Sequence, residues 1–271
     1  MSRSYLFIPG NTPSMIQNLD VFESDSVIID FEDSVISYDK DAARILINNF
    51  LSKFKFSTFD IYIRINDSLN PNFLKDVEAT IDLDINGYVL PKASIDAIDK
   101  LNNLIGEKSI IPIIESPLAL LKAEQIAQCK NVSGLLLGAE DYTKELGVSR
   151  TLIGTEILYA RSHISVVCNA YGIESIDTPY TSKDDEEGLK KDSINAKNLG
   201  FTAKSLIHPN QVDIVNDIFS PSSSEILEAK RIIKKSEETN KGAFSLDGKM
   251  IDLPIIEKAK KVLDRAKKYN L

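Results

Sequence analysis

The apolar and polar positions of this chain form a repeating pattern, in which short apolar runs alternate with longer amphipathic segments. The clearest run, residues 110–114, is too short for a helix and rich in isoleucine, as is typical of a strand buried on both faces of a parallel sheet. Comparable runs predict strands at residues 5–8, 26–30, 59–64, 86–90, 132–138, 175–178 and 202–207. Helices are predicted at residues 12–22, 39–53, 71–82, 94–105, 152–171, 184–199, 210–218 and 222–239, and a further helix begins at Pro117.

Eight strands that each precede a helix predict a (β/α)₈ TIM barrel over residues 1–240. An open doubly wound sheet is the alternative, but no Gly-x-Gly-x-x-Gly motif follows the first strand. Residues 241–271 differ, because a loop-like segment over 241–248 leads into a basic amphipathic helix at 255–269. We expect this C-terminal extension to be either a packing strap or a lid.

The composition narrows the possible partners and the compartment. The 271 residues carry a formal net charge of −8, so nucleic acid is not expected as a main partner and an anionic ligand requires a local basic cluster. Cys129 and Cys168 lack metal-binding or redox spacing and are expected to be reduced. The sequence shows no signal peptide and no apolar run of membrane-spanning length, so we expect a cytoplasmic protein without a membrane partner.

Charged residues collect where the predicted strands end, which in an α/β barrel is the face that carries the active site. Two of them, Glu115 and Asp141, follow neighbouring strands and are 141 − 115 = 26 residues apart. Side by side they would repel each other unless they share a divalent cation, and carboxylate oxygens suit Mg²⁺. The alternative, that both are helix-capping acids, stays open. The other residues expected at this face are Asp30, Glu32, Asp33, Arg64, Asn66, Lys92, Gly138, Glu140, Lys204 and His208.

Both signs of charge at one face suit an anionic substrate that is chelated to a metal ion. Arg64 is the expected partner of a substrate carboxylate or developing oxyanion, because its fork binds oxygen pairs bidentately. A salt bridge to the acids after the second strand is the alternative for this arginine. The backbone N–H groups of Gly138 and Ala139 are a second candidate carboxylate site, unless they form an ordinary tight turn.

Three further residues have competing interpretations. His208 is a candidate base, but a His-Pro pair at a helix start is more typical of a capping residue. Lys92 is a candidate for a Schiff base, although a charged lysine suits the many acids nearby better. Asp252 is an acid in the C-terminal segment and by itself is no more than a loop residue.

Together these segments resemble the citrate lyase beta subunit family of acyl-thioester carbon–carbon lyases, within the hydroxy-oxo-acid aldolase superfamily. Its relatives include malyl-CoA and citramalyl-CoA lyases. The matching motifs run in order along the chain as Arg-Ser-Tyr-Leu-Phe-Ile-Pro-Gly-Asn (3–11), Ile-Asp-Phe-Glu-Asp-Ser-Val (29–35), Lys40 with Ala-Ala-Arg (42–44), Ile-Arg-Ile-Asn (63–66), Leu-Pro-Lys (90–92), Ile-Glu-Ser-Pro (114–117), Gly-Ala-Glu-Asp (138–141), Gly-Phe-Thr-Ala-Lys-Ser-Leu-Ile-His-Pro (200–209) and Gly-Lys-Met-Ile-Asp (248–252). One departure is Thr-Ala at 202–203, where the family usually has Asp-Gly, but Lys204 is kept.

The resemblance implies a Mg²⁺-dependent barrel enzyme that cleaves a 3-hydroxy-3-carboxyacyl thioester to a 2-oxo acid and an acyl thioester. It also implies assembly as a homotrimer or hexamer. By position, Glu115 and Asp141 correspond to the metal ligands and Arg64 to the residue that binds the substrate. Glu32 and Asp33 correspond to residues that order metal-bound water.

Asp252 corresponds to an acid that, in CoA-dependent relatives, reaches the site of a neighbouring subunit from the C-terminal lid. We expect it to exchange the proton of the thioester α-carbon. Citryl, citramalyl and malyl thioesters of CoA or of a carrier protein are all candidate substrates, and the retained Asp252 favours free CoA. Alternatives with the same site are a thioester-independent oxo-acid aldolase, a malyl-CoA thioesterase and a malate synthase-type enzyme. A third possibility is a non-enzymatic subunit that docks an acyl-carrier protein through the basic helix at 255–269.

Overall fold

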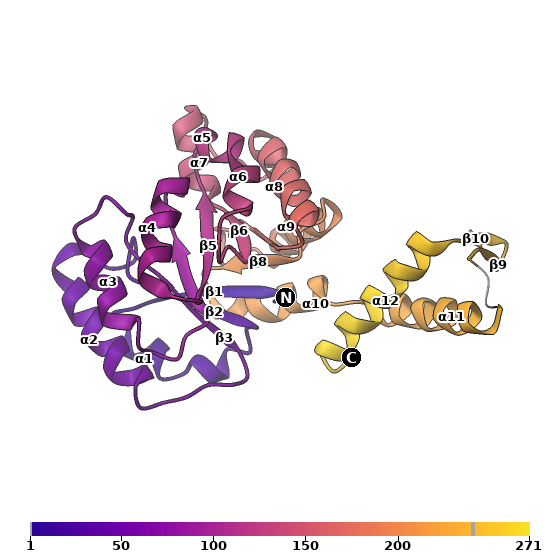
Figure 1. Ribbon diagram of the computed structural model, residues 1–271, viewed down its shortest axis with the longest axis horizontal. Helices are drawn as coiled ribbons and strands as arrows, with labels where there is room; N and C mark the ends of the chain where they lie inside the picture. Colours follow the sequence, from indigo (N-terminus) through magenta and orange to yellow (C-terminus); the bar gives the residue numbers. More distant parts are fainter. Residues whose placement is uncertain (1, 240–241) are drawn as a thin grey trace. The chain divides into compact units, whose positions relative to one another are not determined.

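A computed structural model of the chain describes residues 2–239 and 242–271. Its central feature is a closed barrel of parallel strands, in which each strand pairs with the next in the sequence and β8 returns to pair with β1. The predicted TIM barrel is therefore confirmed (Figure 1). The strands are β1 (Ser4–Pro9), β2 (Ser26–Asp30), β3 (Asp60–Arg64), β4 (Gly87–Leu90), β5 (Ser109–Ile114), β6 (Gly134–Leu137), β7 (Glu174–Asp177) and β8 (Ala203–Leu206).

Helices follow the strands, as the amphipathic segments predict, but two of the predicted helices are wrong in detail. The helix expected over 12–22 is divided into a short α1 and a 3₁₀ turn, and the helix expected from residue 152 begins only at Leu158. A separate helix, α7, directly follows β6 and ends at Gly147, whose φ of 72° is readily adopted only by glycine. The helices are α1 (Pro13–Ile16), α2 (Lys40–Leu51), α3 (Asn72–Thr80), α4 (Ile95–Ile105), α5 (Pro117–Leu121), α6 (Ala123–Ala127), α7 (Ala139–Leu146), α8 (Leu158–Tyr171), α9 (Glu186–Asn198), α10 (Val212–Phe219), α11 (Ser223–Thr239) and α12 (Leu253–Lys268), and the 3₁₀ turns are η1 (Leu19–Val21), η2 (Ser37–Asp39), η3 (Thr155–Ile157) and η4 (Pro209–Gln211).

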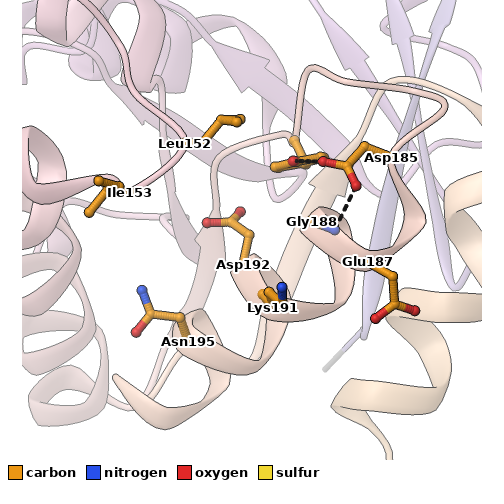
Figure 2. A pocket seen from close by; sticks show the side chains of 9 residues that line it. Leu152, Ile153, Asp185, Glu187, Gly188, Lys191, Asp192 and Asn195 are labelled. Atoms are coloured by element: carbon orange, nitrogen blue, oxygen red, sulfur yellow. Dashed lines mark hydrogen bonds between the residues drawn. The ribbon is translucent and has the colours of Figure 1, made fainter.

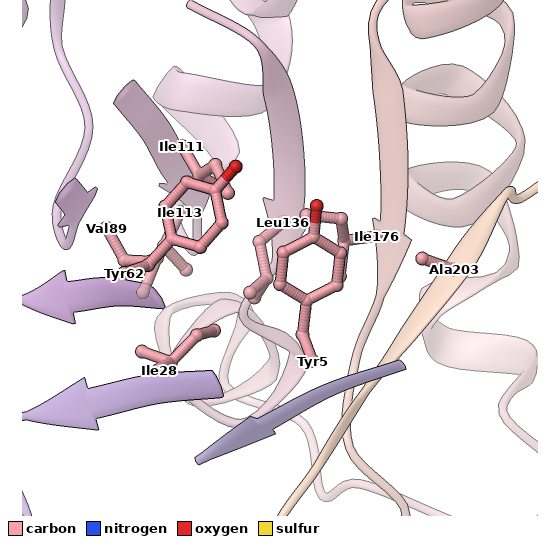
Figure 3. Close-up of a cluster of buried hydrophobic side chains, with 9 residues drawn as sticks. All are labelled: Tyr5, Ile28, Tyr62, Val89, Ile111, Ile113, Leu136, Ile176 and Ala203. Carbon is pink, nitrogen blue, oxygen red and sulfur yellow. The ribbon is translucent and has the colours of Figure 1, made fainter. Parts of the chain in front are cut away.

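Side chains from all eight barrel strands fill the barrel interior (Figure 3). Two tyrosines, Tyr5 and Tyr62, lie among them with ring centroids 5.8 Å apart. Because the interior is a packed core rather than a pore, chemistry is confined to the loops at the ends of the strands. The members of this cluster are Tyr5, Ile28, Tyr62, Val89, Ile111, Ile113, Leu136, Ile176 and Ala203.

The contacts within the chain define two compact units, residues 1–216 and residues 217–271. The predicted boundary, between residues 240 and 241, lies outside the described residues. The contacts place the division earlier because α11 packs against α12 and shares an apolar cluster with it that includes Ile232 and Ile256. Whether the C-terminal segment is a lid stays a prediction.

The segment predicted as a loop over 241–248 contains part of a hairpin in its described portion. β9 (Phe244–Leu246) and β10 (Lys249–Ile251) pair antiparallel, and both turn residues between them, Asp247 and Gly248, have positive φ. An Asp-Gly pair with this backbone is typical of a two-residue hairpin turn. The loop prediction is therefore wrong here, although the Asp-Gly pair in the sequence already indicated a hairpin. Among the described residues, no helix combines the length and apolar character needed to cross a bilayer.

Candidate active site

The carboxyl ends of the barrel strands border two cavities, of about 180 and 480 Å³. The smaller one is lined by residues that lie within or after six strands, β1, β2, β3, β5, β6 and β7, among them Asp33, Arg64 and Thr178. The larger one is lined by Lys92, Ser116, Lys144 and Glu145. Glu115 and Asp141 line both cavities. The structure thus brings together the two acids that were predicted to share one mouth.

Glu115 follows β5 directly and is held by the neighbouring strand, since the backbone N–H of Lys92 donates to its Oε1 at 2.5 Å. It does not cap a helix, because Ser116 occupies the N-cap of α5 and accepts the N–H of Ala119. Burial raises the pKa of Glu115 to about 7, and the negative charge of Asp141 adds to the rise. The surroundings of Glu115 therefore supply too little positive charge to compensate its ionised carboxylate.

Asp141 lies in the first turn of α7, and Gly138 rather than Asp141 is the N-cap residue. Its side chain is about half exposed and lies 3.6 Å from Lys144 Nζ. The alternative that both acids are helix caps is thus wrong, although the dipole of α7 still favours a negative charge at Asp141.

The donor set at this mouth fits Mg²⁺. Two carboxylates with like charge line the same cavities, and burial with the charge of Asp141 raises the pKa of Glu115, so a cation beside it would favour the ionised form. Within residues 2–239 and 242–271, no three His, Cys, Asp or Glu side chains are grouped as a complete metal cage. Magnesium does not need one, because it is usually held by one or two carboxylates and keeps several waters or substrate oxygens.

Arg64, at the end of β3, is held by a bidentate ion pair. Its Nε and Nη2 each donate to one oxygen of Asp30 at 2.7 Å, so the predicted alternative of a salt bridge is present. Its Nη1 lies 3.0 Å from Glu32 and 3.6 Å from Asp33, and Phe7 packs against the guanidinium at 5.0 Å. Since Arg64 also lines the smaller cavity, one edge of the fork is fixed by Asp30 and the other faces the acids at the mouth.

Glu32 and Asp33 differ in their surroundings although they are neighbours in the sequence. Burial raises the pKa of Glu32 to about 8, against the lowering effect of Arg64. The Asp33 side chain is 71% exposed and lines the smaller cavity. Both lie on the turn after β2, beside the guanidinium of Arg64.

The turn at Gly138 and Ala139 does not present two free backbone donors. The N–H of Gly138 donates to the carbonyl of Ile114 at 3.0 Å, and the N–H of Ala139 is directed at Thr178 Oγ1 at 3.4 Å. The glycine is required for a different reason, because a Cβ there would lie 2.7 Å from the Cβ of Glu115. This corresponds more closely to the tight turn that was the alternative interpretation.

Lys204, which was expected at the mouth, is instead buried in an ion cluster. Its Nζ donates to Asp177, to Asp192 and to the carbonyl of Thr178, and Arg161 pairs with the same two acids. Asp192 also borders a separate cavity of about 390 Å³ beside α9 (Figure 2), which shares no lining residue with the mouth cavities. Lys204 therefore supports the wall of the site without facing it.

The other candidates have structural partners. His208 is the N-cap of η4 and accepts the N–H of Asn210, which is the capping role that was the alternative to catalysis. Lys92 lies 3.1 Å from Asp67, and this ion pair raises its pKa, so it is a charged lysine rather than a nucleophile. Asp252, in the second compact unit, is the N-cap of α12, where its Oδ1 accepts the N–H of Ile255 at 3.3 Å.

Sequence reasoning missed Thr178 and Phe7, which line the smaller cavity. Thr178 directly follows β7, so extending the survey of strand ends to that strand would have found it. Phe7 lies inside β1, and no local signal in its apolar run distinguishes it from a core residue.

A closed parallel barrel with an acid pair and a fixed arginine at its carboxyl mouth defines the class of TIM-barrel enzymes with an acidic, metal-compatible site. The model of the HpcH/HpaI aldolase/citrate lyase family matches residues 3–209, so the chain belongs to this family and is a lyase.

Curated relatives match over nearly the full length. The citrate lyase subunit beta of Haemophilus influenzae is 36% identical, over 98% of this chain and 97% of that protein. The mitochondrial citramalyl-CoA lyase of Rattus norvegicus is 31% identical, over 97% of this chain and 86% of that protein. Among solved structures, the protein CitE from Mycobacterium tuberculosis in complex with magnesium, acetoacetate and coenzyme A superimposes with a TM-score of 0.83, at 27% identity and 98% coverage of both chains.

Proposed function

We propose that this protein is a Mg²⁺-dependent lyase that cleaves a 3-hydroxy-3-carboxyacyl thioester to a 2-oxo acid and an acyl thioester. The observation that carries the proposal is the pair Glu115 and Asp141, which line the same cavities next to the fixed fork of Arg64. In the reaction, the bond between the carbinol carbon and the thioester α-carbon breaks. The hydroxyl loses its proton, and the α-carbon gains one.

Glu115 and Asp141 would hold Mg²⁺, which supplies a Lewis acid for hydroxyl and carboxylate oxygens when it is bound. Arg64 orients the substrate carboxylate with Nη1, which lies beside Glu32 and Asp33, since Asp30 already occupies its other edge with a bidentate pair. Because Asp30 fixes the guanidinium before the substrate arrives, little reorganisation is needed as negative charge develops. Glu32 and Asp33 accept hydrogen bonds from water at the mouth.

Asp252 is proposed as the acid that exchanges a proton with the thioester α-carbon. The support for this role is the resemblance of the segment 248–252 to the lid motif of the family. Because we also expect a homotrimer or hexamer, the test must decide whether Asp252 acts in its own subunit or in a neighbouring one. Sedimentation equilibrium measures the assembly, and mixing Asp252→Asn with Asp141→Ala chains restores turnover only if the two residues act across subunits.

The relatives support a thioester substrate, since one is named a citramalyl-CoA lyase and one solved neighbour is a complex with coenzyme A. The experiment is turnover of citramalyl-CoA, malyl-CoA and citryl-CoA with Mg²⁺, repeated with EDTA and with Asp141→Ala. Asp213→Ala is the matched control, because Asp213 is likewise an exposed acid in the first turn of a helix, α10.

Metal-dependent release of pyruvate, glyoxylate or oxaloacetate that is lost in Asp141→Ala and kept in Asp213→Ala is the expected result, and the product identifies the substrate. Release of free CoA in place of an acyl thioester would indicate a thioesterase or synthase. No product from any CoA thioester would overturn the free-CoA proposal. Cleavage of the corresponding hydroxy-oxo acids would then favour an aldolase, and turnover only on a carrier protein would favour a citrate lyase subunit.

A further inference from the structure

The turn after β2, which carries Glu32, is held by charged groups on both of its sides. On the amide side, Asp30 accepts the N–H of Glu32 at 2.8 Å and the N–H of Ser34 at 3.0 Å. On the carbonyl side, Lys40 Nζ donates to the oxygens of Phe31 at 2.7 Å and Glu32 at 2.9 Å. The peptide unit between Phe31 and Glu32 thus has its carbonyl on a cation and its N–H on an anion, which is the orientation that its dipole favours.

Lys40 is itself fixed in place. It is the first residue of α2, it is only 7% exposed, and its Nζ also donates to Asn66 Oδ1 at 2.8 Å. Asn66 in turn donates to Asp76 at 2.6 Å, and the guanidinium of Arg44 donates to the other oxygen of Asp76 at 2.6 Å. This buried network joins the start of α2 to the ends of β2 and β3, and three acceptors hold the ammonium within it.

The same Asp30 carboxylate that holds the amide side of the turn also holds Arg64. A rotation of the turn would remove two of the donors to Asp30 and would shift the Glu32 carboxylate that lies 3.0 Å from Arg64 Nη1. We propose that Lys40 is a positioning residue that locks this turn and so sets the direction of the Nη1 edge of Arg64, which faces Glu32 and Asp33. The proposal rests on the proposed function in one respect, the binding of a substrate carboxylate by Arg64.

The test compares Lys40→Met with Lys108→Met. Methionine keeps the length of the side chain and removes its donors and charge. Lys108 is a matched control because its Nζ likewise donates to two backbone carbonyls, those of Leu83 at 2.9 Å and Ile85 at 3.4 Å, but before the strands at the opposite end of the barrel. Two quantities are measured in both variants. One is the Kd for pyruvate and oxaloacetate with Mg²⁺ by calorimetry, and the other is amide hydrogen exchange over residues 28–36.

Lys40→Met is expected to weaken oxo-acid binding by about 10- to 100-fold, as is typical when a partner behind a ligand-binding group is removed, and to accelerate exchange at the amides of Glu32 and Ser34. Lys108→Met is expected to change neither. Equal Kd values and equal exchange in the two variants would overturn the proposal. If Lys40→Met does not fold, Lys40→Gln, which keeps a donor without the charge, is measured against the same criteria. If the wild type binds no oxo acid, the proposed function fails, and the exchange data still decide whether Lys40 locks the turn.

Discussion

Gly138→Ala tests whether the close packing beside Glu115 holds its carboxylate in place. An alanine Cβ would lie 2.7 Å from Glu115 Cβ and 2.8 Å from Ile113 Cγ2, whereas ordinary contacts begin at 3.4 Å. Restoring an ordinary contact therefore requires the Glu115 side chain or the turn to shift by 3.4 − 2.7 = 0.7 Å. Backbone strain is not the reason, because φ of −92° and ψ of 79° at Gly138 lie outside the left-handed region.

A misplacement of about 1 Å at a site costs about 100-fold in rate, so a displacement of this order in a proposed metal ligand should lower kcat/KM by up to about 100-fold. Overpacking also lowers the free energy of unfolding by about 1–3 kcal/mol. Steady-state kinetics with the active thioester measure the first effect, and urea unfolding measures the second. A control at the amino end of β6 separates the effect on kcat/KM from the effect on stability.

Gly134→Ala is that control. Gly134 is the first residue of β6, and its Cβ would lie 2.9 Å from the carbonyl oxygen of Glu174, so it is overpacked at the amino end of the strand that Gly138 follows and away from the mouth. We expect a comparable loss of stability and an unchanged kcat/KM for the folded protein. Wild-type kcat/KM in Gly138→Ala, or an equal loss in both variants, would refute the reasoning.

Three further predictions concern charged groups. Arg64→Lys should lower kcat/KM by at least about 100-fold, because a point charge cannot bind Asp30 bidentately and also reach the substrate; near-wild-type kinetics would contradict this. Mg²⁺ binding near pH 7 should release protons, because burial and the charge of Asp141 raise the pKa of Glu115 to about 7 and a bound cation requires the ionised carboxylate. Calorimetry in buffers of different ionisation enthalpy measures the release, which should be absent in Glu115→Gln. Burial alone would raise the pKa of Glu156, but hydrogen bonds from Thr151 and Arg150 hold it at about 2. Since the unfolded value is about 4.3, the carboxylate stabilises the fold above that pH and loses this contribution as the pH falls towards 2. The difference in unfolding free energy between wild type and Glu156→Gln should therefore be present at neutral pH and shrink in acid, and a difference that persists unchanged in acid would be inconsistent with this.

The barrel and the residues at its mouth could be predicted because each depends on a local pattern. Apolar runs of four to six residues define most of the strands, with β7 and β8 more polar, and the residue that follows a strand must lie at the carboxyl face once the strands are parallel. Glu115 and Asp141 were placed in this way. The hairpin at 244–251 was missed although its Asp-Gly turn carried a local signal.

The partners of the charged side chains could not be predicted in the same way. Arg64 had three acids within reach in the sequence pattern, and only the register of β2 beside β3 makes Asp30 the bidentate partner. Lys204 was expected at the mouth, yet it is buried with Asp177 and Asp192 behind the wall. The sequence identifies which residues are charged. Where each charged side chain points depends on the neighbours that bury it and compensate its charge in the folded chain.

The sequence by itself therefore determined the alternation of strands and helices, the barrel and several polar residues at its carboxyl end, such as Glu115 and Asp141, because hydrophobic periodicity and strand direction act over a few residues. Only the tertiary structure decided which of these residues face the cavities and which support them from behind. Lys40 shows the difference most clearly, since its ammonium is held by the carbonyls of Phe31 and Glu32 after β2 and by the amide oxygen of Asn66 after β3, which become neighbours only when β2 pairs with β3. The physical reason is that a buried charge is tolerated only where several groups distant in the sequence converge on it.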